Sequence, residues 1–96
     1  MSNTPVKSTV RRRLREFLDS TGRSQQEFED DTNLISGLGL SSDEGVDFVL
    51  DLCESLQVDL PADFNPFVDE TGRRGLRVSE MLSRVENLAS RTGTAA

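Results

Sequence analysis

The sequence predicts a small all-α protein, a bundle of three main helices with a long first loop and a short irregular or helical segment before the last helix. Three stretches carry apolar residues at helical spacing, in residues 5–19, 42–56 and 78–89. A Ser-Ser-Asp-Glu run, typical of a helix start, opens the second stretch, and glycines and prolines separate the three.

Length and composition favour one small domain. The chain has 96 residues, of which 34% are hydrophobic. We therefore expect a single domain over residues 1–96, with its core in about 5–90 and frayed termini. A domain of this size has a modest core and little room for a deep catalytic cleft.

The first predicted helix has a single apolar stripe that ends before Gly22, a residue that terminates helices. Pro5 suits its first turn, where a missing N–H costs nothing. The stripe consists of Val6, Val10, Leu14, Phe17 and Leu18. Arginines off the stripe form either a solvated face, which we favour, or a phosphate contact. They are Arg11, Arg12, Arg13 and Arg15.

Residues 22–39 read as a long loop with little regular structure. Such a loop has to be held by its apolar side chains, because it has few backbone hydrogen bonds of its own. The candidates are Phe28, Leu34, Ile35 and Leu38.

The second predicted helix begins with a capping box. In this motif Ser41 is the N-cap, and its side chain and that of Glu44 each accept a hydrogen bond from a free backbone N–H. Ser42 is then the first helical residue, and the helix continues to about Leu56. Gly45 inside this helix costs about 1 kcal/mol of stability relative to Ala. Either the missing side chain permits another segment to approach the helix closely, or the glycine has no function.

The faces of this second helix differ in polarity. An apolar face comprises Val46, Val49, Leu52, Cys53 and Leu56. An acidic arc on the other side comprises Asp43, Glu44, Asp47, Asp51 and Glu54. Val46 and Leu50 lie at the border between the two.

The remainder of the chain leads to the last helix. Residues 58–61 form a short extended link, and 64–67 form a short helical turn that places two Phe side chains in the core. Residues 72–75 form a loop tip. The last helix, residues 78–89, turns inward its apolar residues Val78, Met81, Leu82, Val85 and Leu88.

Charge is distributed unevenly along the chain, whose net charge is −6. Residues 1–24 and 73–96 are basic, whereas residues 25–72 contain thirteen Asp and Glu and no Lys or Arg. Such a block repels nucleic acid and anionic membranes and attracts basic protein surfaces. The simpler alternative is that the acids only keep the domain in solution.

The composition argues against an enzyme. The chain lacks His, the commonest general base and metal ligand, and its single Cys53 cannot build a zinc site. No apolar run approaches the roughly 20 residues that span a bilayer, and the N-terminus lacks the apolar core of a signal peptide. We expect a cytoplasmic monomer in which Cys53 is a core or half-buried thiol.

The run Leu38-Gly39-Leu40-Ser41-Ser42-Asp43 follows Gly22 and the long loop, opens the acidic helix, and is followed by Leu60-Pro61. This order resembles the acyl carrier proteins of fatty-acid and polyketide synthesis. Their pattern has a Gly after helix one, an anchored loop, Leu-Gly-x-Asp-Ser-Leu, an acidic helix and an apolar-Pro pair. Residues 22–61 can be laid on it without a gap, and the flanking helices match more loosely.

The resemblance implies that Ser42 carries a covalent 4′-phosphopantetheine arm, making this a phosphoprotein whose arm holds an acyl group as a thioester. Ser41 is the less favoured attachment point because it caps the helix. The implied partners are a phosphopantetheinyl transferase and acyl-transferring or condensing enzymes with basic docking surfaces. Their expected docking residues are Asp43, Glu44, Val46, Asp47, Leu50, Asp51 and Glu54.

Three features depart from the family pattern and suggest a divergent or specialised carrier. Ser41 replaces its Asp, Asp43 replaces the apolar residue after the serine, and residues 62–77 are longer than the corresponding connection. The alternative function is an interaction module that keeps the carrier fold and is not modified. Ser42 is then an ordinary helix-start serine.

Overall fold

Residues 6–61, 63–69 and 71–92 are described by a computed structural model of the chain, apart from the side chains of residues 91 and 92. Within them the all-α prediction is confirmed, since the regular elements are helices and strand-like pairing is limited to two isolated bridges. None of the described helices is long and apolar enough to cross a membrane. Pro5 and the outermost residues of both expected frayed termini lie outside the described residues.

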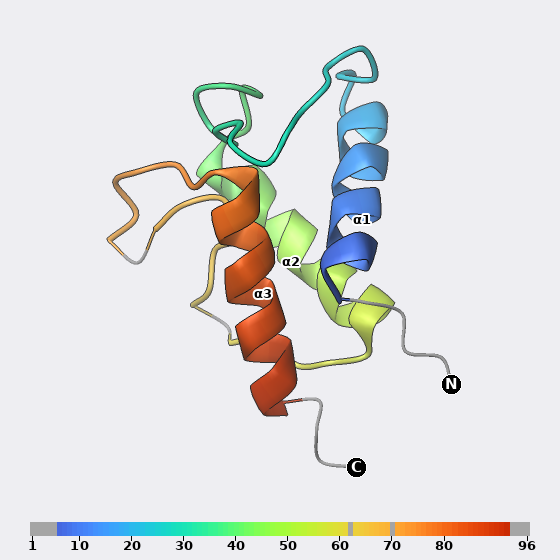
Figure 1. The fold of residues 1–96 in the computed structure, drawn as a ribbon, viewed down its shortest axis with the longest axis vertical. Coiled ribbons are helices and arrows are strands. Elements are labelled where there is room, and N and C mark those ends of the chain that lie inside the picture. Colours follow the sequence, from blue (N-terminus) through green and yellow to red (C-terminus); the bar gives the residue numbers. More distant parts are fainter. Residues whose placement is uncertain (1–5, 62, 70, 93–96) are drawn as a thin grey trace.

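Three helices make up the bundle in this part of the chain. They are α1 (Val6–Ser20), α2 (Ser42–Leu56) and α3 (Val78–Thr92). α1 and α3 run in opposite directions, and α2 crosses the bundle obliquely (Figure 1). α1 packs against both other helices, whereas α2 and α3 have little direct contact. α3 extends three residues beyond its predicted end at Ala89.

The core contains a cluster of aromatic rings. The ring centroid of Phe48 lies 5.3 Å from that of Phe17 and 5.3 Å from that of Phe67, on which it stacks. Such ring pairs contribute beyond the area that they bury. The apolar stripes of α1 and α3 enter the same core, as the sequence predicts, although Val6, Phe17 and Leu88 remain partly exposed.

The inward face of α2 differs from the predicted one. Its buried residues are Gly45, Phe48 and Leu52, whereas the Val46 side chain is 54% exposed. Residues two positions apart on a helix point about 200° apart around its axis, so burying Phe48 turns Val46 outward. The larger aromatic side chain decides the orientation, because its burial removes more apolar surface from water.

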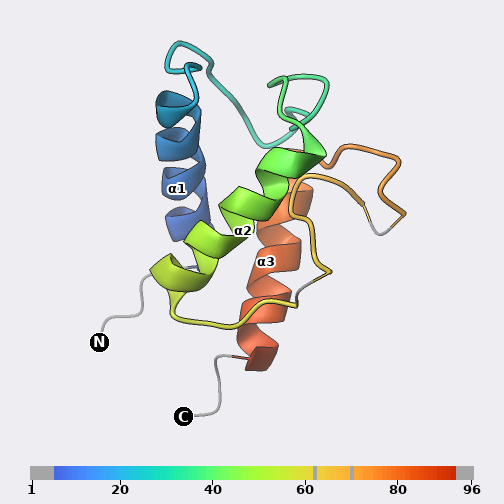
Figure 2. The ribbon, with the colours of Figure 1, turned by 180° about the vertical axis from the view of Figure 1, so that it is seen from behind.

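The segment between α2 and α3 contacts both helices, through Phe67 against Phe48 of α2 and Phe64 against Arg84 of α3. It passes from the end of α2 across α3 and returns along α3 to its start (Figure 2). Phe64 and Phe67 are buried as predicted, but the described residues 64–67 form a turn and no helix. Pro66 disfavours the helical conformation of Asn65, which explains why the predicted helical turn is absent.

The long first loop is held as predicted, by the buried Leu34 and Leu38 and the partly buried Phe28 and Ile35. It also caps α3. The backbone N–H of Val78 donates to the carbonyl of Thr32 at 2.9 Å, and that of Ser79 donates to Asp30 at 2.8 Å. These bonds satisfy N–H groups that a helix start leaves free.

Candidate functional site

Ser41 caps the start of α2. Its backbone is extended, with φ −106° and ψ 162°, and its Oγ accepts a hydrogen bond from the Glu44 N–H at 3.2 Å. In return, Oε1 of Glu44 accepts from the Ser41 N–H at 3.0 Å. The predicted capping box is therefore present, and the hydroxyl of Ser41 is committed to it.

Ser42 is exposed and is the first residue of α2. Its backbone carbonyl accepts a hydrogen bond from Nδ2 of Asn65 at 2.8 Å, while its hydroxyl forms none with any described residue. The hydroxyl is thus available for chemistry. A phosphate attached to it would lie at a helix N-terminus, where free N–H groups and the helix dipole favour an anion.

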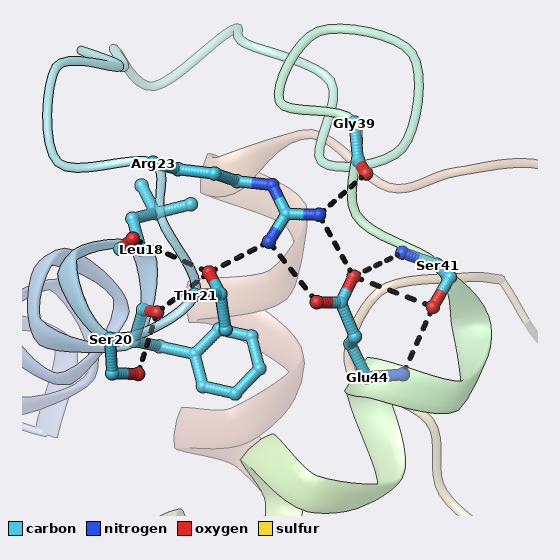
Figure 3. Close-up of polar contacts among 8 residues, drawn as sticks. Leu18, Ser20, Thr21, Arg23, Gly39, Ser41 and Glu44 are labelled. Carbon is cyan, nitrogen blue, oxygen red and sulfur yellow. Dashed lines mark hydrogen bonds and ion pairs between the residues drawn. The ribbon is translucent and has the colours of Figure 1, made fainter.

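Arg23 joins the end of α1 to the start of α2 (Figure 3). Its guanidinium donates to both carboxylate oxygens of Glu44, at 3.1 and 3.2 Å, and to the Gly39 carbonyl at 3.0 Å. Partial burial disfavours the charged form of Glu44. Hydrogen bonds from the Ser41 N–H and the Arg23 guanidinium outweigh this, so the pKa of Glu44 lies below its ordinary value.

A second ion pair joins the middle of α1 to α2. Nε of Arg13 donates to Oδ2 of Asp51 at 2.8 Å, and a second nitrogen donates to Oδ1, so the pair is bidentate. The Arg13 and Asp51 side chains are 31% and 29% exposed. Glu44 and Asp51, both expected at a docking surface, therefore have their charges balanced within the chain.

The other expected docking residues lie on the open face of α2. Asp43, Asp47 and Glu54 are exposed, and no ion pair joins their carboxylates to a described residue. Val46 and Leu50 are 54% and 62% exposed and are the exposed large hydrophobic side chains of the described chain. We call these five residues the α2 face.

Ser42 heads this face. Ser42, Val46 and Leu50 are spaced four residues apart, which places them in one row along the helix. The apolar pair is flanked by carboxylates, so the α2 face combines an apolar centre with an acidic rim. This combination suits a partner with an apolar contact surrounded by basic side chains.

An open groove of about 560 Å³ lies beside Ser42. One wall is the segment that contains Phe64 and Asn65, and the other is α3, which contributes Arg84 and Leu88. We call it the Ser42 groove. Ser42 itself is one of the lining residues.

Sequence reasoning missed the residues that join distant segments. Asn65 contacts the start of α2, and Arg23 and Arg13 balance two of its acids. The available signal was the change from a basic first quarter to an acid-only block, which favours ion pairs between the two. Spacing alone does not say which residues pair.

No family model, curated protein or solved structure matches the chain. In the part of the chain that the structure describes, no three acidic or Cys side chains gather closely enough to hold a metal ion. Cys53 is half-buried on α2. A function therefore has to be inferred from Ser42, the α2 face and the groove.

Proposed function

We propose that the protein is an acyl carrier module. Ser42 is the attachment point of a 4′-phosphopantetheine arm, and the α2 face docks to basic surfaces of a phosphopantetheinyl transferase and of acyl-transferring or condensing enzymes. In this function the module presents a tethered acyl group to its partners and has no turnover of its own.

The exposed, unbonded hydroxyl of Ser42 is the observation that carries the proposal. The neighbouring serine is committed to capping α2, so the two hydroxyls have different roles. A nucleophile that an enzyme has to reach must be exposed, and its product must be tolerated where it forms. Ser42 meets both conditions, because it lies at the positive end of the helix dipole.

The α2 face supports the docking part of the proposal. Val46 and Leu50 continue the row that starts at Ser42, so a partner that grips them reaches the attachment point. Asp43 and Asp47 add negative charge that is not balanced within the described chain. Charge of this kind accelerates encounters with basic surfaces, while the apolar pair contributes buried area.

Modification is tested by co-expression with a broad-specificity phosphopantetheinyl transferase and measurement of the intact mass. We expect a mass increase of one phosphopantetheine group in the wild type and in Ser41→Ala, and none in Ser42→Ala. An unchanged wild-type mass, with the protein folded and the transferase active on a control carrier, excludes the carrier function. It leaves the unmodified interaction module as the alternative.

Docking is tested with the same transferase as the basic partner. We expect Asp47→Lys and Leu50→Ser each to lower its kcat/KM by about ten-fold, as loss of a contact worth about 1.4 kcal/mol would. Asp31→Lys is the matched control, because Asp31 is an exposed acid on the first loop and the change in net charge is the same. Equal effects of Asp47→Lys and Asp31→Lys would show that only net charge matters.

A further inference from the structure

Arg84 of α3 is the unusual residue of the Ser42 groove. Its Nε atom is buried and has no hydrogen-bond partner, and its guanidinium lies over the Phe64 ring, 5.7 Å from the ring centroid. Among the described residues it makes no ion pair. A buried donor without an acceptor is unfavourable, and the half-buried side chain that carries it lines the groove.

The other arginines with described interactions contrast with Arg84. Arg11, Arg13, Arg15, Arg23 and Arg74 each pair with a carboxylate of the chain. Arg84 is therefore the cation of the groove whose charge no described carboxylate balances.

Two carboxylates of the described residues also line the groove, Asp63 and Asp69, but neither forms an ion pair with Arg84. Oδ1 of Asp69 accepts from Thr71 Oγ1 at 2.8 Å and from backbone N–H groups of its own loop, and these bonds lower the pKa of Asp69. Its Oδ2 lies 3.8 Å from Nε of Arg74. Asp63 is exposed, so solvent screens its charge.

The packing around the groove limits what else it holds. Between α1 and α2 the interior is filled by the rings of Phe17, Phe48 and Phe67. Asn65 lies directly against Gly45, so the segment between α2 and α3 contacts α2 at this point. A long alkyl chain would have to displace these contacts, whereas a short group needs only the open groove, whose lining includes Phe64 and Val68.

We propose that the Ser42 groove binds a short acyl group that ends in a carboxylate, with Arg84 as its binding residue. A planar guanidinium offers two parallel donors to a carboxylate, and the Phe64 ring lies against the guanidinium. The carboxylate arrives either on the arm at Ser42 or as a free small acid. Binding of a tethered carboxylate rests on the proposed attachment at Ser42, whereas binding of a free acid in the groove does not depend on that attachment.

The test uses the unmodified full-length protein, so that it does not depend on attachment at Ser42. Succinyl-pantetheine, butyryl-pantetheine and free succinate are titrated separately, and binding is followed by the NMR signal of the Arg84 Nε–H and the groove amides. We expect saturable binding of succinyl-pantetheine, about ten-fold tighter than that of butyryl-pantetheine, because a charge-assisted hydrogen bond is lost with the carboxylate.

Variants separate the guanidinium from general charge. Arg84→Met should abolish the preference for succinyl over butyryl, and Arg84→Lys should restore part of it. Arg73→Met is the matched control, because Arg73 is exposed on the neighbouring loop and its side chain makes no described contact. The amide spectrum of each variant reports whether it folds.

Each outcome decides the proposal. Preference for succinyl-pantetheine over both other probes supports a tethered cargo, and equal binding of free succinate and succinyl-pantetheine supports the groove with a free acid as its ligand. Equal binding of succinyl-pantetheine and butyryl-pantetheine overturns the proposal. So does the absence of binding by both succinyl-pantetheine and free succinate, or a preference for succinyl over butyryl that survives Arg84→Met. Failure of the mass test at Ser42 leaves these titrations unaffected, so the two proposals fail separately.

Discussion

Asn65 occupies the space into which a side chain at Gly45 would project. A Cβ built on Gly45 would overlap the Asn65 amide, whose Nδ2 donates to the Ser42 carbonyl one turn earlier. The glycine that looks unfavourable in the sequence is thus required where the segment between α2 and α3 meets the helix. The contact also fixes the wall of the groove relative to Ser42.

Gly45→Ala should destabilise the protein, although Ala is the better helix former by about 1 kcal/mol. Overlap with Asn65 forces the segment away from α2, and overpacking of this kind costs about 1–3 kcal/mol. Urea unfolding followed by circular dichroism measures the change. In an Asn65→Ala background the same substitution should be neutral or stabilising, and an equal loss in both backgrounds would contradict the contact.

Asp51→Asn should lower the free energy of unfolding by about 1 kcal/mol, because it breaks a half-buried bidentate ion pair with Arg13. Asp47→Asn, on the exposed part of the same helix, should change it by less than about 0.5 kcal/mol. A double-mutant cycle with Arg13→Met measures the coupling. Coupling near zero would show that the pair adds no stability.

Local features of the fold could be predicted from the sequence. The apolar stripes of α1 and α3, the end of α1 before Gly22 and the capping box at Ser41 each depend on a few neighbouring residues. The assignment of Ser42 as the free hydroxyl follows from the capping box. These features are predictable because their hydrogen bonds and periodicity lie within one or two helical turns.

Contacts between distant segments could not be predicted in the same way. Arg13 and Asp51 are 38 positions apart, and nothing in their spacing identifies them as partners. The inward face of α2 depends on where Phe17 and Phe67 meet Phe48, which is a property of the assembled core. For the same reason the acidic arc looked like one surface, although two of its carboxylates are paired internally.

The stability of the protein should depend on the ionisation of Glu44. Its folded-state pKa is lowered, so its contribution is fully present above the unfolded pKa of about 4.3 and is lost as pH falls through the folded-state pKa. Glu44→Gln keeps an oxygen that can accept from Ser41 but removes the charge facing Arg23. We expect the variant to be about 1 kcal/mol less stable at pH 7.

The difference between wild type and Glu44→Gln should shrink as pH falls below the unfolded-state pKa of about 4.3, and it should be lost below the lower folded-state pKa, where the wild-type carboxylate is protonated. Urea unfolding at a series of pH values measures it. Glu27→Gln is the control, since Glu27 is exposed on the first loop and forms no ion pair with a described residue. A difference that is constant between pH 7 and pH 3 would rule out the charge of Glu44 as its cause.

Substitution of Ser41 should lower the stability of the protein, whereas substitution of Ser42 should leave it nearly unchanged. Ser41→Ala removes the N-cap of α2 and should lower the free energy of unfolding by about 1 kcal/mol, and Ser41→Asp should restore it, because Asp is also a good cap. Ser42→Ala should change stability by less than about 0.5 kcal/mol, since its exposed hydroxyl has no described partner. Urea unfolding measures all three variants.

If Ser42→Ala instead destabilises the protein as much as Ser41→Ala does, the two hydroxyls are not divided between capping and chemistry. The loss of modification in Ser42→Ala could then be a consequence of unfolding. A stable, unmodified Ser42→Ala beside a less stable, modified Ser41→Ala is the pattern that the capping geometry and the proposed attachment at Ser42 together predict. It separates the cap from the proposed attachment point by two independent measurements.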